Sequence, residues 1–398
     1  MKGREKMEER LRFIGEPAVP TEGETMIEKW DNALKKFSNL IEEDYQENRE
    51  SREDFEEKLE ILKEIETYLA KEVFDKKING VLYELKAVVP FGSSASELRM
   101  KGGDLDMIVC VHPPLAEKNK ELIHERSNDI LIVIFEHIQT MFAKRDVKEM
   151  EHISTARVPI ITGFVDDVEI DISISMTSMV SAQYLASKFI DAYGKYDRQF
   201  LLLATFVKKW QKSKKTDENE DYFKRVFPNS CSTVLLVIFF MKQYGLLPNS
   251  KKLWKDKLGL NHITWKRVKQ GENGAFGVSN EDVRLWKAKN SYEVNVGTLF
   301  FLFLDFYGNC IDLRLQKLHI GKGTILMKGI KRRGLAEIMY VIDRENTAKS
   351  VIELEKYQEM LRECMGIIKE TENIKSLLEE VLTTELELPK RRNKRVVQ

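Results

Sequence analysis

The chain has 398 residues, and its 64 basic and 64 acidic side chains give a formal net charge of zero at pH 7. This length fits two or three domains of ordinary size. The balanced charge excludes a bulk basic nucleic-acid coat and an acidic disordered tail, although it allows a basic groove that is offset by acidic surface elsewhere. The four cysteines form no CxxC pair and there are only six histidines, so neither a disulfide framework nor a zinc site is indicated.

The N-terminus and the apolar runs bear on location. The first ten residues are mostly charged and do not resemble a signal peptide. The longest apolar runs, such as residues 234–241, hold about eight residues, whereas a membrane helix needs about 20. We therefore expect an intracellular protein without a membrane segment, placed in the cytoplasm, the nucleus or both.

Periodicity changes along the chain and predicts five segments. Residues 1–25 show little periodicity and are predicted to be a flexible arm. Apolar residues recur at spacings of three and four over residues 26–73, which predicts helices that join a central domain. A mixed α/β catalytic domain is expected at 74–180, a mostly helical central domain at 181–380, and a basic tail at 381–398.

Individual elements follow from the same patterns. Within the mixed segment, alternation predicts strands at 105–111, 156–161 and 168–174, with an amphipathic helix at 127–142. The later segment is predicted to contain helices at 200–210, 232–244, 296–307 and 350–368, and a hairpin at 313–327.

Three acidic residues fall on the predicted strands. Asp104 and Asp106 bracket Leu105, and they face the same way because side chains alternate along a strand. Asp171 alternates with isoleucines in a second strand, where an unpaired buried carboxylate would be costly. Three carboxylates on one sheet face repel unless cations neutralise them, and Mg²⁺ or Mn²⁺ prefer oxygen ligands. The pattern therefore predicts a two-metal site that supports in-line phosphoryl transfer.

A candidate phosphate-binding turn precedes these carboxylates. Gly92 and Ser93 follow the apolar residues 88–91. Glycine lets the backbone approach a phosphate closely, and the serine hydroxyl and nearby amides can bind phosphate oxygens. An isolated Gly-Ser pair is usually only a turn, and an isolated Asp-x-Asp is usually a solvated loop. Their order and strand context together favour a nucleotide-binding site.

These motifs resemble the signature of DNA polymerase β-like nucleotidyltransferases. The motif residues are 91–93, 103–109 and 169–172. Within that superfamily the chain is similar to the noncanonical poly(A) polymerase and terminal uridylyltransferase family over roughly residues 30–360. The resemblance implies an α+β fold, in which a polymerase β-like nucleotidyltransferase domain with a mixed sheet packs on a mostly helical, PAP-associated central domain. It also implies an active site in the cleft between them.

The resemblance also implies which reaction is catalysed and which residues take part in it. An RNA 3′-hydroxyl would attack the α-phosphate of UTP or ATP without a template, and pyrophosphate would leave. Asp104 and Asp106 would bind both metals, and Asp171 would help to bind the catalytic metal and promote deprotonation of the hydroxyl. The nucleotide would be contacted by Gly92, Ser93, Ser187, Lys208, Lys212, Ser230 and Asp343.

Three departures from the family pattern leave the choice of base open. Cys231 stands where uridine-preferring members have an aromatic residue that stacks on the base, and a thiol has no π face. Ala186 stands where the family has an asparagine. The loop from Asp343 to Asn346 is short and lacks the histidine associated with uracil preference. Addition of UMP, AMP or both is therefore allowed, with Asp343 and Glu345 as possible acceptors at the base edge.

RNA contact is expected without a dedicated reader. No RRM, KH or zinc-knuckle pattern occurs. Basic clusters at 208–215, 328–333 and 390–395 could contact phosphates, while much of the acidic charge lies in the N-terminal helices. We expect modest affinity for the RNA 3′ end, with either weak sequence preference or a protein partner that delivers the RNA.

Two alternatives remain. One is an oligonucleotide or cyclic-dinucleotide synthase of the same superfamily, against which the Arg157-Val158-Pro159 strand and the C-terminal resemblance argue. The other is a catalytically degenerate scaffold of an RNA-processing complex, against which the persistence of three aspartates and Ser93 argues.

Overall fold

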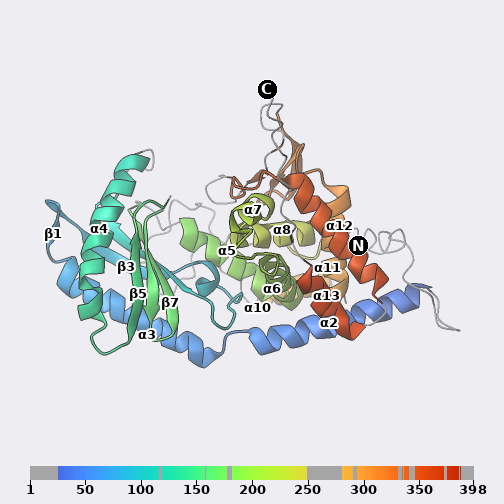
Figure 1. Ribbon diagram of the computed structural model, residues 1–398, viewed down its shortest axis with the longest axis horizontal. Coiled ribbons are helices and arrows are strands. Elements are labelled where there is room, and N and C mark those ends of the chain that lie inside the picture. The colour runs from blue at the N-terminus through green and yellow to red at the C-terminus, as the bar shows by residue number, and fades with distance from the viewer. Residues whose placement is uncertain are drawn as a thin grey trace, which may run out of the picture. The chain divides into compact units, whose positions relative to one another are not determined.

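The structure, a computed structural model, divides into two compact units of helices and strands, which confirms the α+β class (Figure 1). The sheet unit holds the described residues of 46–196 and 251–284, and the helical unit holds those of 1–45, 197–250 and 285–398. The predicted arm at 1–25 and the basic cluster at 390–395 lie outside the described residues. The described residues are 26–115, 119–156, 158–176, 182–248, 280–289, 294–329, 334, 336–339, 346–371, 374–384 and 386.

A five-stranded mixed sheet forms the centre of the sheet unit. Its strand order is β3-β4-β7-β6-β5; β4 and β7 are parallel and the other neighbours are antiparallel. The strands are β3 (Glu84–Pro90), β4 (Leu105–His112), β5 (Val147–Ile153), β6 (Ile160–Val165) and β7 (Val168–Ser175). The predicted strands at 105–111 and 168–174 are confirmed, whereas the strand expected at 156–161 begins at Ile160.

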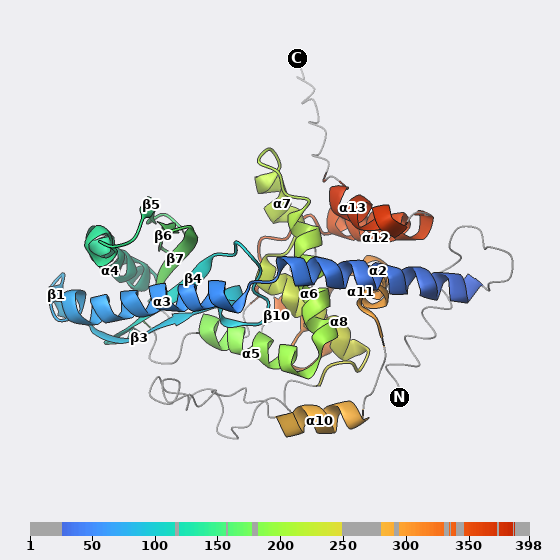
Figure 2. The ribbon, with the colours of Figure 1, turned by 90° about the horizontal axis from the view of Figure 1, so that it is seen from below.

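Two helices cover one face of this sheet. They are α3 (Arg52–Tyr68) and α4 (Lys120–Met141), and Figure 2 shows α3 lying along β3. Buried isoleucines of both helices share one apolar core with Leu105 and Met107 of β4 and Ile170 and Ile172 of β7. Because side chains alternate along a strand, this packing directs the intervening residues of β4 and β7 to the opposite face.

Shorter elements complete the sheet unit. They are η1 (Leu69–Val73), the hairpin of β1 (Lys77–Ile78) and β2 (Val81–Leu82), η2 (Gly92–Ala95) and α5 (Ala182–Tyr196). Helix α3 begins with a capping box, in which the Ser51 hydroxyl accepts from the Asp54 backbone N–H and the Asp54 carboxylate accepts from the Ser51 N–H.

The helical unit is built around buried aromatic side chains. Trp210 lies in edge contact with Phe227 and Phe300, and Phe206 contacts Phe300 in the same way. The predicted helices and hairpin of this region are found with small shifts in their ends. The elements are α6 (Arg198–Lys212), α7 (Glu220–Val226), α8 (Ser230–Gln243), α11 (Val296–Asp305), η6 (Phe306–Cys310), β8 (Gln316–His319), β9 (Thr324–Met327), β10 (Ile338–Met339), α12 (Leu354–Glu370) and α13 (Ile374–Thr383), together with most of α2 (Met26–Asn48) and the second half of α10 (Asn280–Lys289).

The units divide the chain at 45/46, 196/197, 250/251 and 284/285, whereas periodicity predicts boundaries at 73 and 180. Helix α3 belongs to the sheet unit because its apolar face, including Ile61 and Ile65, is buried in the core under the sheet. Helix α5 belongs there because it packs on η2. A helical pattern shows that an apolar face exists but not which core it covers, so these boundaries could not be read from periodicity.

One helical stretch among the described residues, Glu220–Gln243, is long and apolar enough to cross a membrane by length and composition alone. Most of its apolar window is buried inside the protein, which is typical of a core helix. The stretch is also interrupted between α7 and α8.

Helices α2 and α11 approach closely at a glycine in the helical unit. The Ser38 hydroxyl donates to the Asn295 side chain at 2.7 Å and accepts from the Gly297 N–H at 2.8 Å. A Cβ atom on Gly297 would lie 2.4 Å from the Leu34 carbonyl oxygen and 2.8 Å from the Ser38 hydroxyl. The close approach therefore depends on the missing side chain of Gly297.

We expect Gly297→Ala to lower the free energy of unfolding by about 1–3 kcal/mol, because the added methyl group forces two backbones apart. Gly366→Ala in α12 is the matched control. Its Cβ would meet nothing within 4 Å, so the substitution should raise stability by up to about 1 kcal/mol. Urea unfolding of the full chain measures both values. Equal effects of the two substitutions would contradict the close approach.

Candidate active site

Three carboxylates converge on the sheet face opposite α3 and α4. Ligand oxygens of Asp104, Asp106 and Asp171 all lie within 4.8 Å of one another, and each side chain is half-buried. Asp106 of β4 and Asp171 of β7 are direct partners in the parallel ladder, and Asp104 immediately precedes β4. The predicted clustering of the three aspartates is therefore present in the structure.

The Gly92–Ser93 turn lies against this cluster. Gly92 has a φ of +62°, in the left-handed region, and a Cβ atom there would lie 2.7 Å from Asp106 Oδ2. The Phe91 N–H donates to the Asp106 carbonyl oxygen at 3.0 Å. Both the backbone conformation and the contact with Asp106 therefore require glycine. Ser93 follows in η2 with its side chain half-buried.

Two further serines hold this turn and β4 in place. The Ser94 hydroxyl donates to the Asp104 carbonyl oxygen at 2.8 Å and lies 3.3 Å from the Asp106 N–H, from which it accepts. The Ser187 hydroxyl of α5 accepts from the Gly92 N–H at 2.7 Å and donates to the Gln183 carbonyl oxygen at 2.9 Å. Ser187 thus contacts the glycine turn directly, and its role in nucleotide binding stays a prediction.

Electrostatics at the site favour a bound cation. Burial raises the pKa of Asp171; a hydrogen bond from the Thr162 hydroxyl opposes this shift, and the nearby charge of Asp104 adds to it. Positive charge at the cluster would offset both the burial and the repulsion. The three side chains offer oxygen ligands, which suit hard divalent cations. The donor set therefore fits the metal site predicted from the sequence.

Three other residues that were predicted to contact the nucleotide lie in the helical unit. Lys208 and Lys212 lie one turn apart on α6, the first half-buried and the second exposed, while Trp210 between them is fully buried. Ser230 is the exposed first residue of α8, followed by half-buried Cys231. Asp343 lies outside the described residues. The structure thus brings together the aspartates, Gly92, Ser93 and Ser187, and it places the lysines and Ser230 in a different unit.

Reasoning from the sequence missed three residues that hold the aspartates. Ser94 is one, and Thr162 is another because it pairs with Asp171 in the β6–β7 ladder. The two-residue turn at Asp166 and Asp167 fixes the register of that hairpin, so the Thr162 pairing could have been deduced. The third is Lys58, which donates to the Gly103 carbonyl oxygen. Its signal is a lysine on the apolar face of a predicted helix.

Comparisons with known proteins agree with this geometry. Residues 37–195 match the model of the central palm domain of mitochondrial-like poly(A) RNA polymerase. The chain is 24% identical over 263 residues to poly(A) RNA polymerase gld-2 of Caenorhabditis elegans, a match that covers 64% of this chain and 21% of that protein. The chain therefore spans about a fifth of the length of this curated relative.

Solved structures share the fold. The crystal structure of mtPAP in complex with UTP superposes with a TM-score of 0.66 at 18% identity and covers 94% of this chain and 77% of that one. A cytoplasmic RNA terminal U-transferase superposes with a TM-score of 0.60 at 19% identity, covering 90% and 100% respectively. The chain is therefore similar in its residues 37–195 to the palm domain of mitochondrial-like poly(A) RNA polymerase, and it shares its fold with mtPAP and with an RNA terminal U-transferase.

Proposed function

We propose that this protein is a template-independent nucleotidyltransferase that adds UMP, AMP or both to RNA 3′ ends. The observation that carries the proposal is the convergence of Asp104, Asp106 and Asp171 within 4.8 Å beside a glycine turn. Structural ion-pair networks also gather charged groups, but they pair opposite charges. Three mutually repelling carboxylates instead suit the binding of cations.

The carboxylates supply the chemistry of the reaction. Asp104 and Asp106 would hold two divalent cations, Mg²⁺ or Mn²⁺, and Asp171 would share one of them; when bound, these ions would neutralise charge on the transferring phosphoryl group. Asp171, oriented by Thr162, would promote loss of the proton from the RNA 3′-hydroxyl. The 3′-oxygen then forms a bond to the α-phosphorus, the bond from that phosphorus to the bridging oxygen breaks, and pyrophosphate leaves.

Binding of the triphosphate is assigned to other groups. Ser93, on the turn that Gly92 and Ser187 shape, would contact phosphate oxygens. Lys208 and Lys212, one turn apart on α6, would contact the same triphosphate, as the family resemblance implies. Ser230 at the start of α8 and Asp343 are proposed as nucleotide contacts on the same ground.

We propose UTP, ATP or both as the nucleotide substrates. mtPAP has been crystallised in complex with UTP, GTP, CTP and ATPγS, and another similar structure is an RNA terminal U-transferase, which is consistent with more than one nucleotide here. Cys231 offers no stacking surface, which favours relaxed selection. A similar GLD-2 structure was solved as a complex with RNP-8, which supports our proposal of a protein partner that delivers RNA. We place the protein in the cytoplasm, the nucleus or both.

The direct test incubates the full chain with a labelled RNA, each NTP separately, and Mg²⁺ or Mn²⁺. We expect extension with UTP, ATP or both, and we expect Asp171→Asn to lower the rate by at least about 100-fold because a shared metal ligand is lost. Thermal unfolding should show no loss of stability for Asp171→Asn, since burial disfavours the charged carboxylate that it replaces.

Asp167→Asn is the control for this test, because Asp167 lies in the same hairpin with a fully exposed side chain. It should keep the rate of the wild type. Failure of every NTP to extend the RNA, together with identical behaviour of wild type and Asp171→Asn, would overturn the proposed activity.

Substitution of Gly92 tests the role of the glycine turn. Gly92→Ala should lower activity by about 10-fold or more, because its Cβ would meet the Asp106 carboxylate and displace a metal ligand. Gly80→Ala is the control: Gly80 also has a positive φ, +79°, but its Cβ would meet nothing within 4 Å. Both variants should lose some stability, measured by thermal unfolding, and only Gly92→Ala should lose activity. Equal activity of the two variants would contradict the role of the contact.

A further inference from the structure

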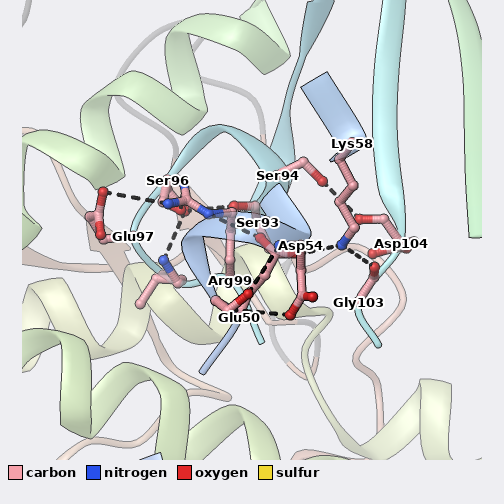
Figure 3. A network of polar contacts seen from close by, with 12 residues as sticks. Glu50, Asp54, Lys58, Ser93, Ser94, Ser96, Glu97, Arg99, Gly103 and Asp104 are labelled. Atoms are coloured by element: carbon pink, nitrogen blue, oxygen red, sulfur yellow. Dashed lines mark hydrogen bonds and ion pairs between the residues drawn. The ribbon is translucent and has the colours of Figure 1, made fainter. Parts of the chain in front are cut away.

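A buried ion pair lies next to the aspartate cluster within the sheet unit. Lys58 of α3 contacts Glu50, which precedes that helix, and the two side chains are 8% and 2% exposed (Figure 3). The Lys58 ammonium also donates to the Gly103 carbonyl oxygen at 2.5 Å. Gly103 immediately precedes Asp104, so the pair reaches the backbone of a proposed metal ligand.

Stabilisation of the fold does not by itself explain why this ion pair is present. The free energy needed to remove two charges from water can equal the free energy gained from their attraction. Apolar side chains of similar volume often stabilise a fold equally well. An apolar side chain could not, however, donate to the Gly103 carbonyl. The Ser94 hydroxyl donates to the next carbonyl, that of Asp104. The backbone carbonyls on both sides of the Asp104 Cα are therefore held by side chains.

The second carboxylate oxygen of Glu50 faces Arg99, which lies in the loop between η2 and β4. It lies 3.2 Å from Arg99 Nε. Arg99 in turn donates from Nη1 to the Ser96 carbonyl oxygen at 2.9 Å, and its guanidinium lies 3.8 Å from the centre of the Phe55 ring. Figure 3 shows the polar contacts of Glu50, Lys58 and Arg99 converging on the loop between η2 and β4. Glu50 thus links both ends of residues 96–103.

We propose that Lys58, held by Glu50, is a positioning residue that fixes the Asp104 carboxylate for metal binding. Lys58 acts through the Gly103 carbonyl and is not itself a catalytic residue. The inference deepens the proposed nucleotidyl transfer and rests on it. The loop from the glycine turn to β4 carries Gly92 and Ser93 at one end and Asp104 at the other, so one buried anchor sets the spacing between the phosphate turn and the metal ligands.

The test compares Lys58→Met with the double variant Glu50→Gln/Lys58→Met in the full chain. Lys58→Met alone leaves a buried carboxylate without its lysine and so endangers folding. The double variant removes both charges and should fold, yet it still lacks the donor to Gly103. We expect it to need about 10–100-fold more Mn²⁺ for half-maximal activity, because groups that orient metal ligands contribute by that factor.

The affinity of the double variant for Mn²⁺, measured by electron paramagnetic resonance without nucleotide or RNA, should fall by a similar factor. Lys63→Met is the matched control, since Lys63 is exposed on the same helix, and it should behave like the wild type. A double variant that folds and keeps the Mn²⁺ dependence of the wild type would overturn the positioning role while leaving the proposed function intact.

Two other outcomes are equally decisive. A double variant that does not fold would also count against the proposal, because the pair would then serve stability. A wild type that neither binds Mn²⁺ nor extends RNA would instead refute the proposed function, and the positioning role with it.

Discussion

Mutual repulsion of three carboxylates is the constraint to which the sheet unit is adapted. Asp104, Asp106 and Asp171 bring their oxygens within 4.8 Å, and burial raises the pKa of Asp171. An arrangement of this kind does not hold itself together, so its backbone must be fixed from outside. The parallel pairing of β4 with β7 fixes two of the aspartates, and hydrogen bonds to the backbone around Asp104 fix the third.

The same two strands also supply the core. Leu105, Met107, Ile170 and Ile172 are fully buried beneath α3 and α4, and the residues between them face the opposite side. A shift of one residue in register would bury the aspartates and expose the core. The hydrophobic effect that stabilises the fold therefore also orients the metal ligands, so a change of register would disrupt both.

The strands and helices that were predicted correctly followed from the local spacing of apolar residues. The strands around Asp106 and Asp171 were found because aspartates alternate there with large apolar residues, and the helices of the second unit followed from their apolar spacing. Strand β5 was not predicted, since its sequence from Val147 to Ile153 is rich in charge, as suits a strand at the edge of the described sheet. Lys58 contacts Gly103, 45 positions away along the chain, and no local pattern specifies such a contact.

We propose that the carboxylate face transfers a nucleotide to the 3′-hydroxyl of RNA. The most direct measurement is the linkage of the product, determined by nuclease digestion and mass spectrometry after reaction with a labelled NTP. We predict 3′–5′-linked nucleotides at the RNA 3′ end, one pyrophosphate released for each nucleotide added, and no extension of an RNA that ends in a 3′-deoxynucleotide. Extension of that blocked RNA, or formation of only 2′-linked or cyclic products, would contradict the account.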